Sequence, residues 1–216
     1  MIDESVVREN LRRIRERIAR AGGTNVKVVA VTKALPSDAW TVASAVGCDA
    51  LGENYAQEVV AKAGEVDNHL PVHFIGQLQS NKVRSLTGLV DVWQSVDRES
   101  LLREIVKRAE GLNPPRIHVQ VNTTGEPNKG GCEPQELARL VDLARALGCR
   151  VEGAMTVGPT STDAQETRKA FALLRVMADD LGLVERSMGM TGDLEIAVEE
   201  GSTMVRIGTA LFGQRP

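Results

Sequence analysis

The chain has 216 residues, of which 42% are hydrophobic, so it can bury a substantial core in one large domain or two small ones. Its formal net charge of −3 argues against a protein that binds the phosphate backbone of nucleic acid. Aromatic residues make up only 3% of the chain, which leaves few rings on which unpaired bases could stack.

The cysteines and the first residues bear on the compartment. Cys48, Cys132 and Cys149 are odd in number and show no metal-ligand spacing, which suits a reducing compartment. The first residues are charged, and no apolar run approaches the length needed to cross a membrane. We therefore expect a cytoplasmic protein with no membrane or nucleic-acid partner.

Strand and helix patterns alternate along the whole chain. Short apolar runs rich in β-branched residues indicate strands, and longer segments with an apolar stripe indicate helices. In chain order we expect helix 4–20, strand 27–32, helix 37–46, strand 49–52, helix 54–66, strand 71–75, helix 81–86, strand 91–96, helix 98–110, strand 116–122, helix 134–147, strand 150–156, helix 163–181, strand 186–190, helix 193–200 and strand 203–207.

Eight strands joined by helices predict an α/β fold with parallel crossovers, and eight strands can close into a (β/α)8 TIM barrel. The extra helix at 4–20 can fill the outer position that would follow the eighth strand. No Pro-, Gly- or Ser-rich linker interrupts the series, so we expect residues 1–216 to form a single domain. An open doubly wound sheet is the alternative, but the first strand is not followed by a Gly-rich dinucleotide-binding turn.

Lys33 stands at the end of the first predicted strand, where the working face of such a barrel lies. A partly desolvated lysine loses its proton more easily and can condense with an aldehyde. The alternative is a lysine that extends into water from the end of the strand.

The last two predicted strands end in segments that suit a phosphate group. Ser187–Met190 and Arg206–Thr209 follow strands seven and eight, where phosphate sites of such barrels often lie. Small residues let backbone N–H groups approach an anion, and Ser187 and Thr209 offer hydroxyl groups. Glycines in such places usually only turn the chain, so either segment alone is weak evidence.

Three further residues belong to the same predicted face. Arg206 either donates to a ligand ring or anion, or forms a buried pair with Glu53 or Asp193. Asn54 either binds a ligand oxygen or caps the next helix, and Met155 packs in the wall. An imine-forming lysine, a phosphate cradle and an arginine together point to pyridoxal 5′-phosphate, the vitamin B6 cofactor, which has an aldehyde, a phosphate and a ring nitrogen.

Several segments resemble the pyridoxal phosphate homeostasis protein family, also called the YggS family. The resemblance covers essentially the whole chain, and its segments are specific in combination. They are Val-Ala-Val-Thr-Lys at 29–33, Gly-Glu-Asn-Tyr-Ala-Gln-Glu at 52–58, His-Phe-Ile-Gly-Gln-Leu-Gln-Ser-Asn-Lys at 73–82, Ser-Met-Gly-Met-Thr-Gly-Asp at 187–193 and Arg-Ile-Gly-Thr-Ala-Leu-Phe-Gly at 206–213. Where this chain has Thr191 the family often has serine, a change that retains the hydroxyl group.

The resemblance implies a barrel like the N-terminal domain of alanine racemase, with pyridoxal 5′-phosphate bound as a Schiff base (an aldimine) on a lysine. Carried over residue by residue, the lysine is Lys33, the phosphate ligands are Ser187, the Met188 main chain, Gly208 and Thr209, Arg206 faces the pyridine nitrogen, and Asn54 and Met155 flank the ring. Members of the family are regarded as buffering or delivering the cofactor, without a demonstrated reaction.

Two observations favour a binding protein over an enzyme, so we expect no catalytic residue. An arginine at the pyridine nitrogen stays charged and disfavours its protonation, which weakens the ring as an electron sink. Alanine racemases add a tyrosine from across a dimer, whereas this chain has one tyrosine, Tyr55. A low-activity amino-acid racemase and a lysine aldolase acting on a phosphorylated sugar remain alternatives, and apo-enzymes that depend on pyridoxal phosphate are the expected partners.

Overall fold

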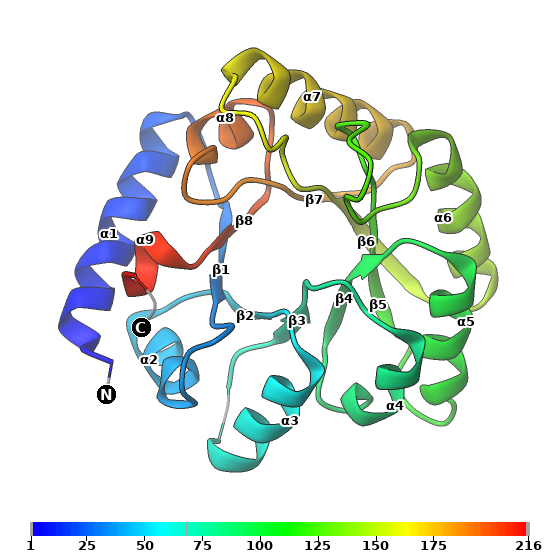
Figure 1. Ribbon diagram of the computed structural model, residues 1–216, viewed down its shortest axis with the longest axis horizontal. Coiled ribbons are helices and arrows are strands. Elements are labelled where there is room, and N and C mark those ends of the chain that lie inside the picture. Colours follow the sequence, from blue (N-terminus) through cyan, green and yellow to red (C-terminus); the bar gives the residue numbers. More distant parts are fainter. Residues whose placement is uncertain (1, 68, 215–216) are drawn as a thin grey trace.

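Eight parallel strands close into a barrel in their chain order in the computed structural model, which describes residues 2–67 and 69–214 (Figure 1). Strand β1 pairs with β2 on one side and with β8 on the other, where Val29 lies opposite Arg206. The predicted (β/α)8 barrel is therefore confirmed. The strands are β1 Lys27–Val31, β2 Ala50–Glu53, β3 Val72–Phe74, β4 Val92–Val96, β5 Arg116–Gln120, β6 Arg150–Met155, β7 Glu185–Ser187 and β8 Met204–Ile207.

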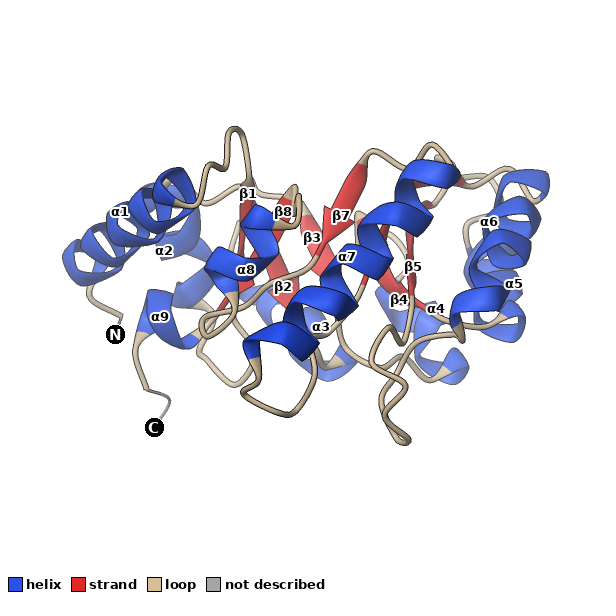
Figure 2. Cartoon of the chain, turned by 90° about the horizontal axis from the view of Figure 1, so that it is seen from above, coloured by secondary structure: helices blue, strands red, loops and turns tan. Residues whose placement is uncertain are grey.

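Helices surround the barrel, as the side view in Figure 2 also shows. They are α1 Glu4–Arg20, α2 Asp38–Val46, α3 Ala56–Glu65, α4 Val83–Leu86, α5 Glu99–Arg108, α6 Leu137–Ala146, α7 Ala164–Asp180, α8 Leu194–Glu199 and α9 Thr209–Phe212. Two predicted helices begin as 3-10 turns, η1 Ser80–Lys82 and η2 Pro134–Glu136, and α9 was not predicted. In the part of the chain that the structure describes, every helix is too short or too polar to cross a membrane.

Helix α1 occupies the outer position between the first and last strand–helix units, as predicted. The Asp3 carboxylate caps its first turn by accepting from the N–H groups of Ser5 and Val6. Its apolar stripe is buried and consists of Val7, Leu11, Ile14 and Ile18. The helix packs against α2, α8 and α9, so it covers the place where β8 meets β1 (Figure 1).

Alternate residues of the strands face two different environments. Val28 and Ala30 belong to the large core between barrel and helices, whereas Val29 joins Ala50 and Met204 in a separate cluster. Because side chains alternate along a strand, this second cluster lies inside the barrel. The same alternation places the side chains of Lys33 and Arg206 toward the barrel axis.

Candidate functional site

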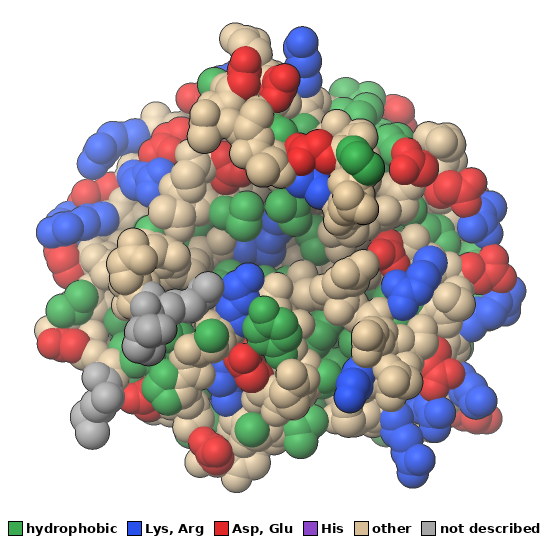
Figure 3. All heavy atoms as spheres, viewed as in Figure 1, with side chains coloured by type: hydrophobic (Ala, Val, Ile, Leu, Met, Phe, Trp, Pro, Cys, Tyr) green, Lys and Arg blue, Asp and Glu red, His purple; other side chains and the backbone are tan. Residues whose placement is uncertain are grey.

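A cavity of about 400 Å³ opens at the carboxyl ends of the strands. Its wall comes from segments that follow β1, β2, β3, β6, β7 and β8, and consists of Val31, Lys33, Asn54, Ile75, Val157, Met190, Thr191, Gly192, Arg206, Gly208 and Thr209. Figure 3 shows this face hollowed near its centre, with Lys and Arg side chains in the hollow. The volume is that of a site for a small molecule.

Lys33 lies in a tight turn directly after β1 and lines this cavity, half-buried. The next residue, Ala34, has a φ of +58°, a conformation that non-glycine residues seldom adopt. The Ala34 N–H donates to a Glu58 carboxylate oxygen at 2.8 Å, which holds the turn in this conformation. The backbone that carries Lys33 is therefore fixed from outside the cavity.

A buried ion pair supports the same turn from the outer side of the barrel. The Lys62 ammonium lies 2.7 Å from Glu53 Oε1 and also donates to the Thr32 carbonyl oxygen at 2.7 Å. Glu53 Oε1 further accepts from the Thr32 hydroxyl at 2.6 Å and from the Trp40 indole N–H at 2.9 Å. Both members of the ion pair are excluded from water, with side-chain exposures of 5% and 0%. The pair therefore fixes the end of β1 just before Lys33.

Arg206 is a buried cation at the bottom of the cavity. Its guanidinium donates to the Ser187 carbonyl oxygen at 2.7 Å, the Ser187 hydroxyl at 2.8 Å and the Thr156 carbonyl oxygen at 2.7 Å. Among the described residues no carboxylate lies within ion-pair distance of it, so the predicted alternative of a pair with Glu53 or Asp193 does not form. Burial lowers the pKa of Arg206 to about 10, although the nearby Asp193 charge opposes this shift, and the group stays charged at neutral pH.

The rest of the wall offers hydrogen-bonding groups to a ligand. Asn54 Oδ1 is buried, and within the described chain it accepts no hydrogen bond. The backbone N–H groups of Thr191, Gly192, Gly208 and Thr209 likewise donate to no backbone acceptor in the described chain. N–H groups that converge on a concave surface suit an anion.

Three residues predicted for the site lie beneath the cavity wall. Met155, Ser187 and Met188 have exposures of 1%, 0% and 0% and do not line the cavity. The Met188 N–H already donates to the Met204 carbonyl oxygen at 3.1 Å. Thr191 lines the cavity instead and was missed, although its position in the Ser-Met-Gly-Met-Thr segment was a signal.

A second group of charges fills the opposite end of the barrel. Glu185 on β7 lies 2.5 Å from Lys27 Nζ and 2.7 Å from His118 Nε2. Burial alone would raise the pKa of Glu185, but the hydrogen bonds from His118 and Lys27 lower it to about 2. His118, Glu152 and Glu185 have the spacing of metal ligands. Since Arg116, Arg150 and Lys27 neutralise the two carboxylates, we assign the group to the packing of the barrel.

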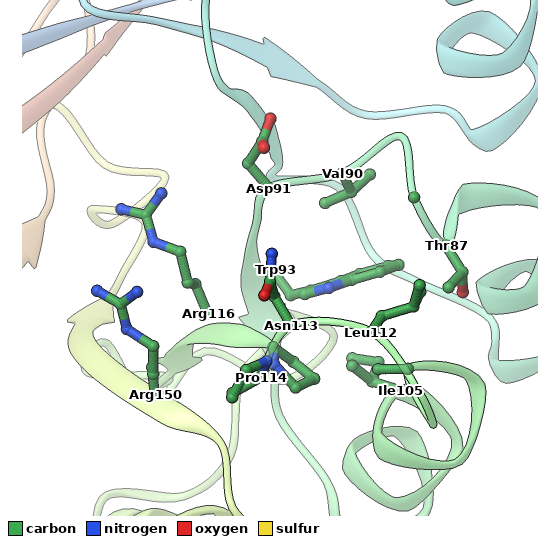
Figure 4. A pocket seen from close by; sticks show the side chains of 13 residues that line it. Thr87, Val90, Asp91, Trp93, Ile105, Leu112, Asn113, Pro114, Arg116 and Arg150 are labelled. Atoms are coloured by element: carbon green, nitrogen blue, oxygen red, sulfur yellow. The ribbon is translucent and has the colours of Figure 1, made fainter.

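Another cavity, of about 500 Å³, lies at the amino ends of β4 and β5 (Figure 4). The Trp93 indole lies beside Ile105 and Leu112, whereas the Arg116 and Arg150 side chains run parallel on the far side. Both arginines are paired with Glu152, so their charges are already compensated.

Fold and geometry together define a (β/α)8 barrel protein with a cavity of small-molecule size, bordered by a lysine and an arginine, at the carboxyl ends of its strands. The family model "Alanine racemase, N-terminal domain" matches residues 2–216, and the chain therefore belongs to this family.

Individual relatives are similar over nearly their whole length. The pyridoxal phosphate homeostasis protein of Pseudomonas aeruginosa is 40% identical over 222 residues, which cover 98% of this chain and 96% of the relative. The structure of Synechococcus elongatus PipY with PLP bound has a TM-score of 0.84 and 34% identity, and the match covers 96% of this chain and all of PipY. A protein of unknown function from Bifidobacterium adolescentis superposes with a TM-score of 0.90 at 35% identity, covering 98% of both chains.

Proposed function

We propose that this chain binds pyridoxal 5′-phosphate in the cavity between Lys33 and Arg206 and takes part in the homeostasis of this cofactor by storing it or passing it to apo-enzymes. The observation that carries the proposal is that one small cavity brings together a lysine and a buried arginine whose hydrogen-bond partners among the described residues are all neutral. The names of the relatives and the PLP-bound PipY structure support the same ligand.

The residues of the cavity fit the parts of this cofactor. The Lys33 amine would add to the aldehyde carbon and, with loss of water, replace the carbonyl oxygen by nitrogen. The N–H groups of Gly208 and Thr209 would hold the phosphate. Thr191 lines the cavity beside these N–H groups, so its hydroxyl could also bind the phosphate. The Ser187 hydroxyl already accepts from Arg206 and donates to Gln94.

Arg206 and Asn54 would hold the ring. The Arg206 guanidinium would donate to the pyridine nitrogen, and Asn54 Oδ1, which lacks a donor among the described residues, would accept from a ring substituent. Met155 would support the ring from beneath the wall. In this arrangement all of residues 1–216 would serve as one binding domain.

The charge on Arg206 favours storage over turnover. The bound cofactor supplies an electron sink when its ring nitrogen is protonated, and a charged arginine at that nitrogen opposes protonation. Lys33 and Arg206 are the ionisable residues among those that line the cavity. Tyr55 lines a neighbouring hollow instead and is 48% exposed. A racemase needs an acid–base group on each face of its substrate, and the described residues that line this cavity supply one, Lys33.

A visible spectrum of the purified protein, followed by borohydride reduction and mass analysis of peptides, tests the proposal. We expect absorbance from a bound chromophore and a pyridoxyl group on the Lys33 peptide. Lys33→Ala should abolish both, whereas Lys107→Ala, an exposed lysine on the outer helix α5, should change neither. A colourless protein that fails to bind added pyridoxal 5′-phosphate would refute the proposal, and amino-acid racemisation that vanishes with Lys33→Ala would show an enzyme instead.

A further inference from the structure

A chain of buried hydrogen bonds runs from Arg206 into the middle of the barrel. The Ser187 hydroxyl, which accepts from Arg206 at 2.8 Å, lies 2.7 Å from Gln94 Oε1. The Gln94 amide nitrogen in turn lies 2.6 Å from His73 Nδ1. Gln94 and Ser187 have an exposure of 0% and His73 of 3%, so water does not compete with these bonds.

The bonds of this chain all run in one direction, away from Arg206. A guanidinium can only donate, so the Ser187 oxygen accepts from Arg206, and the Ser187 O–H donates in turn to Gln94 Oε1. The Gln94 amide nitrogen then faces away from Ser187, and its two hydrogens point to His73 Nδ1 and to the Met204 sulfur at 3.1 Å. The Met204 sulfur can only accept, so the contacts on the two sides of the Gln94 amide agree on this orientation.

His73 can accept the hydrogen bond from Gln94 in only one protonation state and tautomer. Nδ1 must accept from Gln94, so the ring is neutral and carries its hydrogen on Nε2. Burial lowers the pKa of His73 to about 3, and the charge of His118 adds to this shift, so the ring is neutral at physiological pH. The hydrogen bond from Gln94 and the lowered pKa therefore both indicate a neutral His73 ring.

We propose that Ser187, Gln94 and His73 form a positioning relay for Arg206, in which Gln94 links the Ser187 hydroxyl to the neutral His73 ring. The Ser187 hydroxyl and carbonyl use both hydrogens of one terminal nitrogen of Arg206, and the Thr156 carbonyl uses one hydrogen of the other. The second hydrogen of that nitrogen and the Nε–H are left for a ligand. Ser187 is then a positioning residue and not a phosphate ligand. The effect of the relay on the cofactor rests on the function proposed above, whereas the relay itself belongs to the ligand-free protein.

Binding of two ligands separates positioning from phosphate contact. Pyridoxal has the same ring and aldehyde as pyridoxal 5′-phosphate but lacks the phosphate. Gln94→Leu and Ser187→Ala should raise the dissociation constants of both ligands by a similar factor, on the order of tenfold, because each variant removes a hydrogen bond in a chain that ends on a charged group. Thr209→Ala, a change in the phosphate wall, should weaken only pyridoxal 5′-phosphate.

Gln94→Glu is the matched conservative variant. Its carboxylate still accepts from the Ser187 hydroxyl, so the affinity for both ligands should stay within about threefold of wild type. The other carboxylate oxygen has no hydrogen to donate, and the His73 ring should therefore place a hydrogen on Nδ1. Nitrogen-15 NMR of the histidine rings in the ligand-free protein measures this change directly.

The outcomes divide as follows. A His73 ring with its hydrogen on Nε2 in wild type and on Nδ1 in Gln94→Glu supports the relay, and the opposite tautomer in wild type overturns it, even if Gln94→Leu fails to fold. If Ser187→Ala weakens only pyridoxal 5′-phosphate, Ser187 is a phosphate ligand and the proposal is wrong. If wild type binds neither ligand, the proposed function fails, while the NMR measurement still decides the relay.

Discussion

The two ends of the barrel interior hold their charges in opposite ways. At the amino end, Glu185 pairs with Lys27 and His118, so each charge there has a partner of opposite sign or a hydrogen bond to one. At the carboxyl end, the described chain gives Arg206 only two carbonyl oxygens and one hydroxyl. Arg206 is buried and Glu185 partly buried, and burying a charge without a counter-ion costs free energy.

This difference distinguishes charges that stabilise the fold from a charge that is available to a ligand. Charges that already have partners of opposite sign require no ligand, and their ion pairs stabilise the fold. A buried guanidinium that has only neutral acceptors keeps its full charge available, and an anionic or electron-rich ligand can complete its environment. Four predictions test or sharpen this contrast, beginning with the largest expected effect.

Lys62→Met should reduce the free energy of unfolding by about 4 kcal/mol, because it leaves the Glu53 carboxylate buried without a cation. This variant tests whether the Lys62–Glu53 ion pair, which lies on the outer side of the barrel near its carboxyl end, also stabilises the fold. Urea unfolding measures the loss. Since the pair fixes the turn before Lys33, the variant should also lower retention of pyridoxal 5′-phosphate. Unchanged stability would show that the pair contributes nothing, and Lys107→Met is the surface control.

Arg206→Met should raise the dissociation constant of pyridoxal 5′-phosphate about 100-fold, since it removes a charged hydrogen bond that we assign to the ring. Stability should stay within about 1 kcal/mol of wild type or rise, because no carboxylate in the described chain is left unpaired. Fluorescence titration and urea unfolding give the two values. A large loss of stability would show that Arg206 stabilises the fold, as the charges at the amino end do, and would contradict its assignment to ligand binding.

Glu185→Gln should show the reverse pattern. The amide weakens the hydrogen bonds to Lys27 and His118, and we expect a loss of about 2 kcal/mol of unfolding free energy. The affinity for pyridoxal 5′-phosphate should not change, because the group lies at the end of the barrel away from the cavity. A weaker affinity at unchanged stability would contradict the separation of the two ends.

Acid should destabilise the fold through two groups of the barrel interior, Glu185 and His73, in different pH windows. The pKa of Glu185 falls from its ordinary 4.5 to about 2, so its contribution is present above pH 4.5 and is lost as pH falls toward 2. The pKa of His73 falls from 6.5 to about 3, so protonation of the unfolded chain lowers stability from pH 6.5 downward. Urea unfolding as a function of pH should show both losses, and Glu185→Gln should remove only the lower one.

The sequence predicted most of the barrel because hydrophobic periodicity and glycine positions are local signals. All eight strands lie where the pattern indicates, with ends that differ by at most a few residues. Helix α9 was missed because Thr209–Phe212 is too short to show a periodic apolar stripe. The 3-10 turns at Ser80–Lys82 and Pro134–Glu136 were read as the first turns of helices for the same reason.

For the site, chain position placed Lys33, Asn54, Arg206, Gly208 and Thr209 at the carboxyl ends of the strands, and the structure places all five in the wall of one cavity. It could not decide which hydroxyl of the segment 187–191 faces the cavity. Side-chain direction depends on where β7 ends, and the structure ends it at Ser187. Ser187 consequently points into the barrel and Thr191 lines the cavity.

By itself the sequence determined the barrel, the order of its strands and the lysine at the rim, because these follow from local periodicity and from the fact that parallel strands share one carboxyl end. Only the tertiary structure decided the partners of the buried charges. Lys62 on α3 donates a hydrogen bond to Glu53 on β2, and Arg206 on β8 donates one to Ser187 on β7. The sequence offers several possible partners for each buried charge, and only the packing of the chain in three dimensions decides which partner lies within hydrogen-bond distance.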